Sequence, residues 1–288
     1  MMNIKELKKE AANNYAFWYY QFNSKIVIQN QVRNREFALL LSKDEPNENK
    51  EFYSLRNIKV TKLNNIDYVL NVNDMMRKGA LFSLYKSVAY YDGGIPFIKT
   101  LEERKEWNSK NHNHIKGYDF VIDIDADDVS EIPLALESVK MIVDLYDKME
   151  LPYTIVFSGM GFHITIPYIF QTHEVTEDYF HPFNENGIYA KFQKIANKLY
   201  NEYTEMIDLN IYDHRRLIKV PFSLAFYEDG CFVAYPINTK PDLNNFDREK
   251  YKFHHIYQFA LQQNKIRIWN NPKDRGGEKV DFPNCLLD

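Results

Sequence analysis

The most informative stretch of the sequence is Phe120-Val-Ile-Asp-Ile-Asp-Ala-Asp-Asp128. Its apolar start predicts a buried strand that runs into a group of carboxylates. Because successive side chains of a strand point to opposite faces, we expect Asp123 and Asp125 on one face and Ile124 in the core. Two like charges this close resist ionisation unless a cation lies between them. Oxygen ligands without nearby thiolates favour Mg²⁺, Mn²⁺ or Ca²⁺.

Two other interpretations of this stretch compete with a metal site. An acidic segment after a strand is often only a solvated turn, and the residues of this stretch alone leave that alternative open. An EF-hand loop beginning at Asp123 fails, because its sixth position is Asp128 where glycine is needed. Its twelfth position is Leu134, where the loop needs a bidentate Glu.

Length and composition bound the class of protein. A chain of 288 residues with 45% apolar residues can form one large domain or two closely packed modules. It has no run of about 18 apolar residues and begins with a charged amphipathic segment, so we expect a soluble, cytoplasmic protein without a membrane partner. Cys231 and Cys285 lie too far apart for a CxxC site, so neither zinc nor a disulfide is expected. The net charge of -4 requires any nucleic-acid contact to come from local basic patches.

In the first half of the chain, apolar spacing predicts a helix over residues 3–22. Strands are expected within residues 32–42 and near 52–60, and a charged helix over 101–110 that Thr100 could cap. Residues 66–88 are apolar without a clear period. We interpret His112 and His114 as surface residues.

After the acidic stretch, the spacing predicts a helix over residues 131–149 between strands at 120–124 and 152–157. A helix between two apolar strands indicates a βαβ unit or a related α/β sandwich. The next strand, at 163–167, follows Ser158-Gly-Met-Gly-Phe-His163. The two glycines permit either a simple hairpin or a turn whose amides approach an anion.

The remaining segments are less distinctive. Apolar spacing predicts a helix over 188–206, a hairpin strand over 231–236 after Gly230, and a helix over 251–262. The last residues, 265–288, are basic and include Trp269. They could touch a nucleic-acid backbone, but a solvated tail is the preferred interpretation.

Three motifs stand in an order that resembles the archaeo-eukaryotic primase superfamily, in particular the catalytic small subunit of DNA primase and the primase-polymerases. They are hydrophobic-Asp-x-Asp at Asp123 and Asp125, Ser-Gly-x-Gly-x-His from Ser158 to His163, and Ile-Asp at Asp208 followed by Arg-Leu-Ile-Lys-x-Pro-Phe-Ser from Arg216 to Ser223. Arg35-Glu-Phe-Ala38 and Ala89-Tyr-Tyr-Asp92 are similar to segments in the N-terminal half of that family. The resemblance covers residues 30–240.

This resemblance implies template-directed nucleotidyl transfer, with Asp123, Asp125 and Asp208 as the carboxylates that bind two Mg²⁺ or Mn²⁺ ions. The nucleotide-binding residues that it implies are Ser158, Gly159, Gly161, His163, Arg216, Lys219 and Ser223. The chemistry of nucleotidyl transfer requires the same kind of site, because attack of a 3′-hydroxyl on an α-phosphorus is promoted by two metals about 3.5 to 4 Å apart.

Several positions depart from the family pattern. Ala225 stands where the family has His, and Met160 stands where some relatives have Arg. The spacing between Asp208 and Leu217 is one residue short, which leaves Asp213 as a less favoured third carboxylate. The chain also lacks the cysteine cluster of many primase small subunits, which is typical of a plasmid, viral or divergent primase-polymerase.

We therefore expect a mixed α/β (α+β) primase fold. It would have an N-terminal α/β module over residues 1–115 and a catalytic core with a sheet like that of RNA-recognition motifs over 116–240. Residues 241–288 would form a helix and a tail packed on the core or extending from it.

The expected function is that of a metal-dependent DNA primase or primase-polymerase that uses NTPs or dNTPs on single-stranded DNA. Possible partners are a primase large subunit or a replicative helicase. Two alternatives remain open: a catalytically weakened relative that serves as a DNA-binding or scaffold subunit, and a carboxylate-metal phosphodiesterase.

Overall fold

The computed structural model describes residues 34–42, 52–55, 82–92, 100–171, 178–227, 229–237, 240–256 and 284–287. The helix expected over residues 3–22 and most of the basic C-terminal segment lie outside the described residues. Within these ranges, no helix has the length and apolar character that crossing a bilayer requires.

A four-stranded antiparallel sheet contains the acidic strand. Its strands, in spatial order, are β12 (Tyr235–Ile237), β7 (Thr154–Phe157), β8 (Phe162–Ile166) and β6 (Phe120–Ile124). Both β6 and β7 run antiparallel to β8, so they are parallel to each other with β8 between them. The expected βαβ unit is therefore confirmed in a split form, with a third strand inserted between the two parallel ones.

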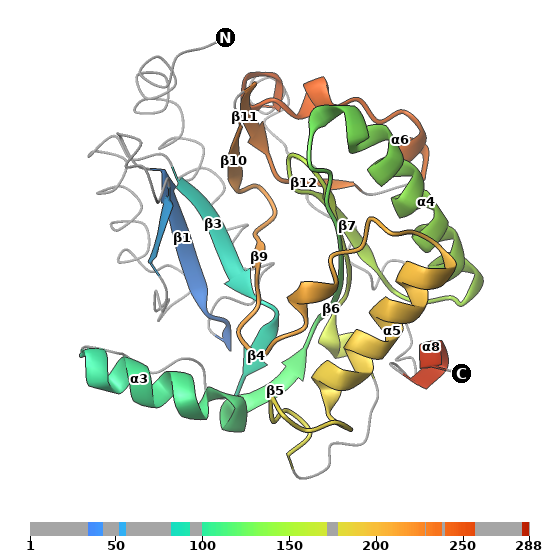
Figure 1. Ribbon diagram of the computed structural model, residues 1–288. Coiled ribbons are helices and arrows are strands. Elements are labelled where there is room, and N and C mark those ends of the chain that lie inside the picture. The colour runs from blue at the N-terminus through green and yellow to red at the C-terminus, as the bar shows by residue number, and fades with distance from the viewer. Residues whose placement is uncertain are drawn as a thin grey trace.

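Two long helices cover one face of this sheet (Figure 1). Helix α4 (Ile132–Lys148) connects β6 to β7 and has Pro133 in its first turn, where a missing amide proton costs nothing. Helix α5 (Ile188–Glu202) follows β8. It ends earlier than the apolar spacing to Met206 indicated, and the chain then places Ile207 in an antiparallel bridge with Ile124.

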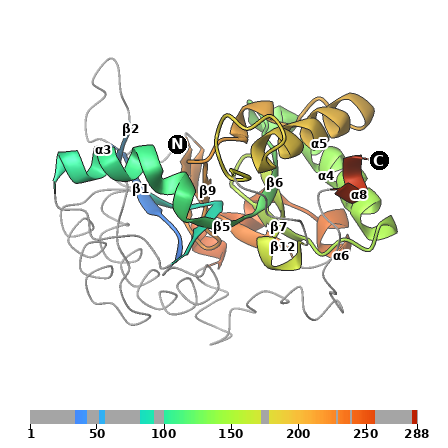
Figure 2. The same ribbon diagram turned by 90° about the horizontal axis from the view of Figure 1, so that it is seen from below.

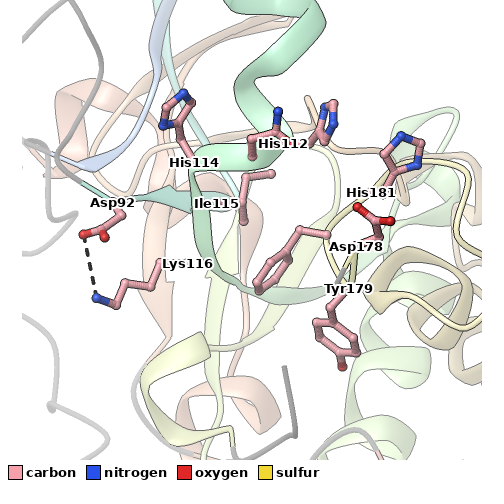
Figure 3. Close-up of a pocket in the computed structure, with 10 residues that line it drawn as sticks. Asp92, His112, His114, Ile115, Lys116, Asp178, Tyr179 and His181 are labelled. Atoms are coloured by element: carbon pink, nitrogen blue, oxygen red, sulfur yellow. Dashed lines mark ion pairs between the residues drawn. The ribbon is translucent and has the colours of Figure 1, made fainter. Parts of the chain in front are cut away.

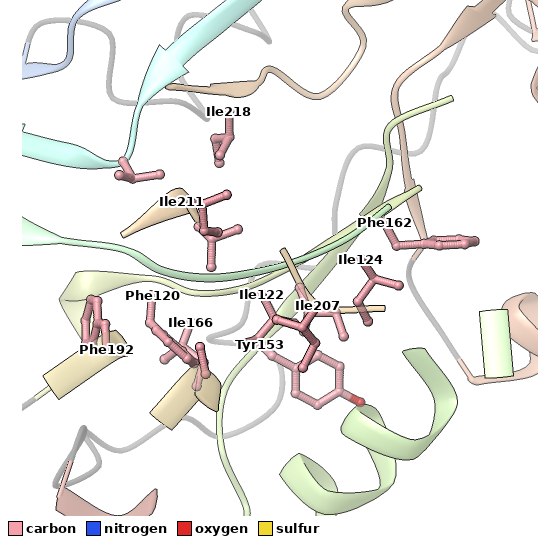
Figure 4. Close-up of a cluster of buried hydrophobic side chains, with 14 of the residues drawn as sticks. Phe120, Ile122, Ile124, Tyr153, Phe162, Ile166, Phe192, Ile207, Ile211 and Ile218 are labelled. Atoms are coloured by element: carbon pink, nitrogen blue, oxygen red, sulfur yellow. The ribbon is translucent and has the colours of Figure 1, made fainter. Parts of the chain in front are cut away.

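The core lies between the sheet and these helices (Figure 4). Phe120, Ile122 and Ile124 each have 0% exposure, and the Phe120 ring lies 4.8 Å from the Phe192 ring of α5. These residues alternate along β6, so Asp123 belongs to the opposite face of the strand. The expected division between an apolar face and an acidic face of β6 is confirmed.

A second antiparallel sheet lies on the other side of the molecule (Figure 1). Its spatial order is β2 (Phe52–Leu55), β1 (Phe37–Ser42), β3 (Phe82–Ser87) and β9 (Leu217–Lys219). Because β9 comes from the second half of the chain, the two halves share this sheet. The boundary expected near residue 115 thus separates segments that are hydrogen bonded across it.

A buried ion pair links the two halves. Arg35 Nη2 lies 2.8 Å from an Asp119 carboxylate oxygen, and Arg35 also donates to the carbonyls of Ser87 and Val88 at 2.9 Å each. Strands β4 (Ala89–Tyr91) and β5 (Ile115–Tyr118) pair beside it. Removing one partner of such a pair leaves a buried charge and typically costs about 3 to 5 kcal/mol.

Shorter elements complete the described fold. Helix α3 (Leu101–Lys110) lies across one end of the second sheet (Figure 2), and the capping box of Thr100 and Glu103 confirms its expected start. The strand expected over 231–236 is divided between β11 (Gly230–Val233), which pairs with β10 (Leu224–Tyr227), and β12, which pairs with β7. The elements described after residue 239 are α6 (Lys240–Asn244), a 3-10 turn η6 (Arg248–Tyr251), a helical turn at 253–256 and α8 (Asn284–Leu287).

Candidate active site

Asp123 and His163 lie directly opposite each other in the β6–β8 pair, so their side chains share one face of the sheet. The distance from Asp123 Oδ1 to His163 Nε2 is 3.4 Å, and both side chains are largely buried. This face turns toward β3 and β9, because Tyr85 and Lys219 interact electrostatically with Asp123. The site therefore lies between the two sheets.

Asp208 reaches the same place through the backbone. Its amide donates a 2.9 Å hydrogen bond to the carbonyl of Asp123, next to the Ile207–Ile124 bridge. Its side chain, however, accepts hydrogen bonds from the amide and the side-chain Nδ2 of Asn210, at 2.8 and 3.1 Å. Asp213 instead is exposed and lies 3.5 Å from Arg216 Nε. Asp208 rather than Asp213 is thus the neighbour of Asp123.

Burial and mutual repulsion destabilise the charged forms of these carboxylates. Burial, and then the nearby Asp208 charge, raises the pKa of Asp123 to about 7. Asp125 is itself exposed, yet the protein around it still desolvates its carboxyl group, and together with Asp123 this raises its pKa to about 6. Burial lowers the pKa of His163 to about 4, so its ring is neutral at pH 7. A bound cation would relieve the repulsion that these carboxylates share.

The fit to a divalent cation is good at two positions and incomplete at the third. Asp123 Oδ1 is buried without a hydrogen-bond partner among the residues that the structure describes, and carboxylate oxygens are the ligands that Mg²⁺ and Mn²⁺ prefer. Among the described residues, however, no three His, Cys, Asp or Glu side chains are arranged to hold a metal ion. Asp208 would have to turn its carboxylate away from Asn210 to become the third ligand.

The glycine turn after β7 packs against this cluster. The Ser158 amide donates to the Gly161 carbonyl at 2.8 Å, and the Gly161 amide donates to Ser158 Oγ at 3.2 Å. Gly159 has φ +112°, which L side chains rarely adopt. A Cβ on Gly161 would lie 2.2 Å from the Ile124 carbonyl oxygen and 2.6 Å from Asp125 Oδ1. Both glycines are therefore required for the turn to approach Asp125 this closely.

Two cations hold the carbonyls of this turn. Lys219 Nζ donates to the Ser158 carbonyl at 2.8 Å, and Arg248 Nε donates to the Gly159 carbonyl at 3.0 Å. The C=O and N–H of a trans peptide point in opposite directions, so the amides of Gly159 and Met160 are directed away from these cations. Neither amide donates a hydrogen bond to any part of the protein that the structure describes. Consecutive amides of this kind can bind an anion.

Lys219 and Tyr85 line the site from the second sheet. Burial lowers the pKa of Lys219 to about 8, although the Asp125 and Asp123 charges oppose this shift. The same ammonium lies 5.6 Å from the centre of the Tyr227 ring and 6.0 Å from that of Tyr85. Burial, then the two aspartates, raises the pKa of Tyr85 to about 12. Tyr85 lies in the segment whose structure the sequence left unassigned.

Two of the expected nucleotide-binding residues have their polar groups engaged elsewhere. Arg216 donates to the carbonyls of Ile211, at 3.0 Å, and Asn210, so it braces the loop that follows Asp208. Ser223 is fully buried, and its hydroxyl accepts from the Leu84 amide at 2.7 Å. The structure does not bring the Ser223 hydroxyl together with the glycine turn.

Two of the departures from the family pattern, Ala225 and Met160, lie at the glycine turn. The Ala225 side chain is buried against the turn, where its Cβ lies 3.0 Å from the place that a Cβ on Gly159 would take. Arg248 Nη2 donates to Met160 Sδ at 3.3 Å, and the guanidinium forms an ion pair with Asp229. An arginine thus does reach the turn, but from the C-terminal segment. Sequence reasoning missed it, because one arginine in the charged run 247–252 has no distinguishing spacing.

No family model matches the sequence, and no curated protein matches it either. Among solved structures, the protein is similar to the polymerase domain of ligase D from Mycobacterium tuberculosis in complex with DNA, with a TM-score of 0.53 and 12% sequence identity. The match covers 92% of this chain and 91% of that chain. This protein has the fold of that polymerase domain. The mixed α/β fold expected from the sequence is therefore confirmed.

Proposed function

We propose that this protein is a metal-dependent nucleotidyltransferase, a primase or primase-polymerase that extends a 3′-hydroxyl on a single-stranded DNA template and releases pyrophosphate. The observation that carries the proposal is the contact between the carboxylates and the glycine turn. The acidic end of β6 touches a glycine turn whose Gly159 and Met160 amides are unpaired within the described structure. A carboxylate cluster beside an anion-binding turn is the arrangement that phosphoryl transfer needs.

In this proposal the carboxylates hold the metal ions. Asp123 and Asp125 bind Mg²⁺ or Mn²⁺, and Asp208 joins them when its side chain leaves Asn210. The bound ions would activate the 3′-hydroxyl and neutralise the leaving pyrophosphate. The Asp123 and Asp125 carboxyls give up their protons on binding metal, because their pKa values of about 7 and about 6 keep them partly protonated near neutral pH.

The other residues bind and orient the triphosphate. The amides of Gly159 and Met160 donate to phosphate oxygens, and Lys219 supplies a positive charge next to the turn. Its pKa of about 8 keeps it mostly charged at pH 7. His163 contributes a neutral ring whose Nδ1 is buried without a hydrogen-bond partner in the described structure. Arg216 acts indirectly, by holding the loop that carries Asp208.

The comparison with solved structures supports DNA as the template. The polymerase domain with the similar fold was solved with DNA, and in our proposal this protein also acts on DNA. A primase large subunit or a replicative helicase is proposed as a partner on the family resemblance.

Primer synthesis on unprimed single-stranded DNA tests the proposal. Labelled NTPs and dNTPs are supplied separately, each with Mg²⁺ and with Mn²⁺. We expect labelled products with at least one nucleotide and metal combination, and none when Asp125→Asn replaces the wild type. Asp127→Asn is the matched control, because Asp127 is an exposed carboxylate of the same segment. Incorporation that survives Asp125→Asn contradicts the proposed role of Asp125.

One alternative has an observation in its favour. Ala225 provides no hydrogen-bond donor where the family has His, which favours a catalytically weakened relative that still binds DNA. That alternative predicts triphosphate and DNA binding without incorporation under any of the four conditions. A phosphodiesterase, in contrast, needs no triphosphate site, so nucleotide binding in the absence of DNA separates it from both.

A further inference from the structure

The loop before α5, residues 178–187, is an ordered structure built from consecutive turns. The His181 amide donates to the Asp178 carbonyl at 2.8 Å, and the Asn184 amide donates to the His181 carbonyl at 3.1 Å. The side-chain Nδ2 of Asn184 also donates a 3.0 Å hydrogen bond to the Asp178 carbonyl. Asp178 has φ +62°, a conformation that non-glycine residues rarely adopt. The loop thus has a defined shape, held partly against local backbone preference.

This ordered loop presents a phenylalanine to solvent. Phe183 is 88% exposed, and its ring centre lies 5.8 Å from that of His181. Burying a side chain of this size stabilises a folded protein, and Phe183 does not contribute that stabilisation here. The hydrogen-bonded turns of this loop hold the backbone of Phe183 in place, and its exposed ring is available to stack on a flat ligand.

A cavity of about 520 Å³ has His181 in its lining (Figure 3). It separates the loop from the segment formed by η2 (Asn111–His114) and the start of β5. Its lining residues include Asp92, His112, Asn113, Lys116, Asp178 and His181. The His112 and His181 rings pack edge to face in its wall, with their ring centres 4.8 Å apart.

The chemistry of the cavity fits a nucleobase better than an isolated anion or a metal. Asp92 and Asp178 would repel a free phosphate, while the amide of Asn113 offers both a donor and an acceptor. Burial and the neighbouring His181 lower the pKa of His112, so its ring is uncharged at neutral pH. The described residues contain no group of three His, Cys, Asp or Glu side chains that could hold a metal ion. A flat, neutral ligand that forms hydrogen bonds fits the residues that line the cavity.

Positive charge for a nucleic-acid backbone is available at the rim. Lys191 Nζ lies 5.4 Å from the centre of the Tyr179 ring, another lining residue. Lys116 lies on the opposite side, 3.7 Å from Asp92, with both groups exposed. Exposed pairs of this kind are weak and exchange partners at little cost.

The cavity is separate from the active site. It opens at the start of β5, whereas Asp123 lies near the end of β6, and these two strands follow each other directly in the chain. At about 3.3 Å per residue, the chain between the two places can span at most roughly 25 Å.

We propose that Phe183 and the adjoining cavity bind an unpaired base of single-stranded nucleic acid. The identity of the ligand rests on the proposed function, because a template-directed enzyme must hold its unpaired strand beyond the reacting position. Stacking of a base on an aromatic side chain contributes about 1 to 3 kcal/mol and tolerates any base.

Binding of a fluorescein-labelled oligo(dT), followed by anisotropy without nucleotides or metal, tests this proposal. We expect Phe183→Ala to weaken binding about 5- to 150-fold, as loss of one stacked base predicts. Phe183→Tyr, which keeps the ring, should bind like the wild type. Leu134→Ala is the matched control, because Leu134 is 57% exposed on α4 and lies outside the cavity lining. Binding by Phe183→Ala within twofold of the wild type overturns the proposal.

Two further readouts keep the result interpretable. The effect of Phe183→Ala should persist at high salt, because stacking is less sensitive to salt than phosphate contacts. If the variant weakens binding of dTMP but not of the oligonucleotide, the cavity is a mononucleotide site and the proposal is wrong. Failure of the proposed function looks different: incorporation is absent with wild-type protein, while oligonucleotide binding still depends on Phe183.

Discussion

The main-chain amide of Asp208 donates a 2.9 Å hydrogen bond to the main-chain carbonyl of Asp123. This bond, with the Ile207–Ile124 bridge beside it, makes the segment after α5 the neighbour of β6. The third acidic residue therefore reaches the site by backbone pairing, independently of any side-chain contact or metal ion. Substitutions of the Asp208 side chain should leave this link, and hence the local fold, in place.

Asp123→Asn should stabilise the protein, and more so at high pH. The folded state raises the pKa of Asp123 from 3.8 to about 7, so between these values it binds more protons than the unfolded state. Stability is therefore lost as pH rises through this window, and the amide removes that loss. We expect a gain of roughly 1 to 3 kcal/mol in the free energy of unfolding at pH 8 and little gain at pH 4.

Urea denaturation at both pH values measures this difference. Asp127→Asn serves as the control, because its exposed carboxylate should give no gain at either pH. A variant that is less stable than the wild type at pH 8 would show that Asp123 contributes to stability instead of opposing it.

Divalent metal should stabilise the folded protein through Asp123 and Asp125. A ligand at 100 times its Kd adds about 2.7 kcal/mol to the free energy of unfolding. We expect Mg²⁺ and Mn²⁺ to raise the melting temperature of the wild type, and more at pH 8 than at pH 6 because binding must displace protons. Differential scanning fluorimetry measures the shift. Asp125→Asn should abolish it and Asp127→Asn should not; equal shifts in all three proteins refute a metal site here.

Arg248→Met should impair nucleotide binding more than turnover. The substitution removes the hydrogen bond to the Gly159 carbonyl and the ion pair with Asp229, so the turn loses one of its two cationic supports. We expect the KM for the nucleotide to rise about tenfold or more, with a smaller change in kcat and an unchanged thermal shift by metal. Lys250→Met is the control, because Lys250 is exposed and its one ion pair in the described structure, with Asp247, is long at 4.0 Å. An unaltered KM in Arg248→Met means that the turn does not depend on this arginine.

Gly161→Ala should reduce activity with little effect on the global fold. The new Cβ would lie 2.2 Å from the Ile124 carbonyl oxygen, so the turn must move away from Asp125. Misplacement of a binding group by about 1 Å can cost about 100-fold in rate. Gly230→Ala is a suitable control: its φ of +143° makes the substitution straining, but the nearest atom is 3.6 Å away. Steady-state rates equal to wild type in Gly161→Ala would show that the turn does not position the substrate.

Local sequence patterns predicted the parts of the fold that depend on neighbouring residues. Thr100 and Glu103 form the capping box that starts α3 because both partners lie within one turn. Likewise, the alternation of Ile122, Asp123 and Ile124 was sufficient to assign the two faces of β6. The motifs also led to the expectation of a mixed α/β fold, which the structural comparison confirms.

Features that depend on distant pairing could not be predicted in this way. Tyr235 pairs with Phe157 across the sheet, and no local signal separates this strand from the preceding β11. Arg248 approaches Gly159 only because the C-terminal segment folds back over the turn. Ser223 matches the family motif, yet its hydroxyl is occupied by the Leu84 amide, a contact that only the packing of two sheets reveals.

Extension of a labelled primer on a DNA template, with purified wild type and Asp123→Asn compared under single-turnover conditions, tests the central claim most directly. The proposed site predicts template-directed addition with pyrophosphate release by the wild type, and none by Asp123→Asn even though that variant is folded and more stable. Addition at the wild-type rate by Asp123→Asn would contradict a reaction centred on the acidic end of β6.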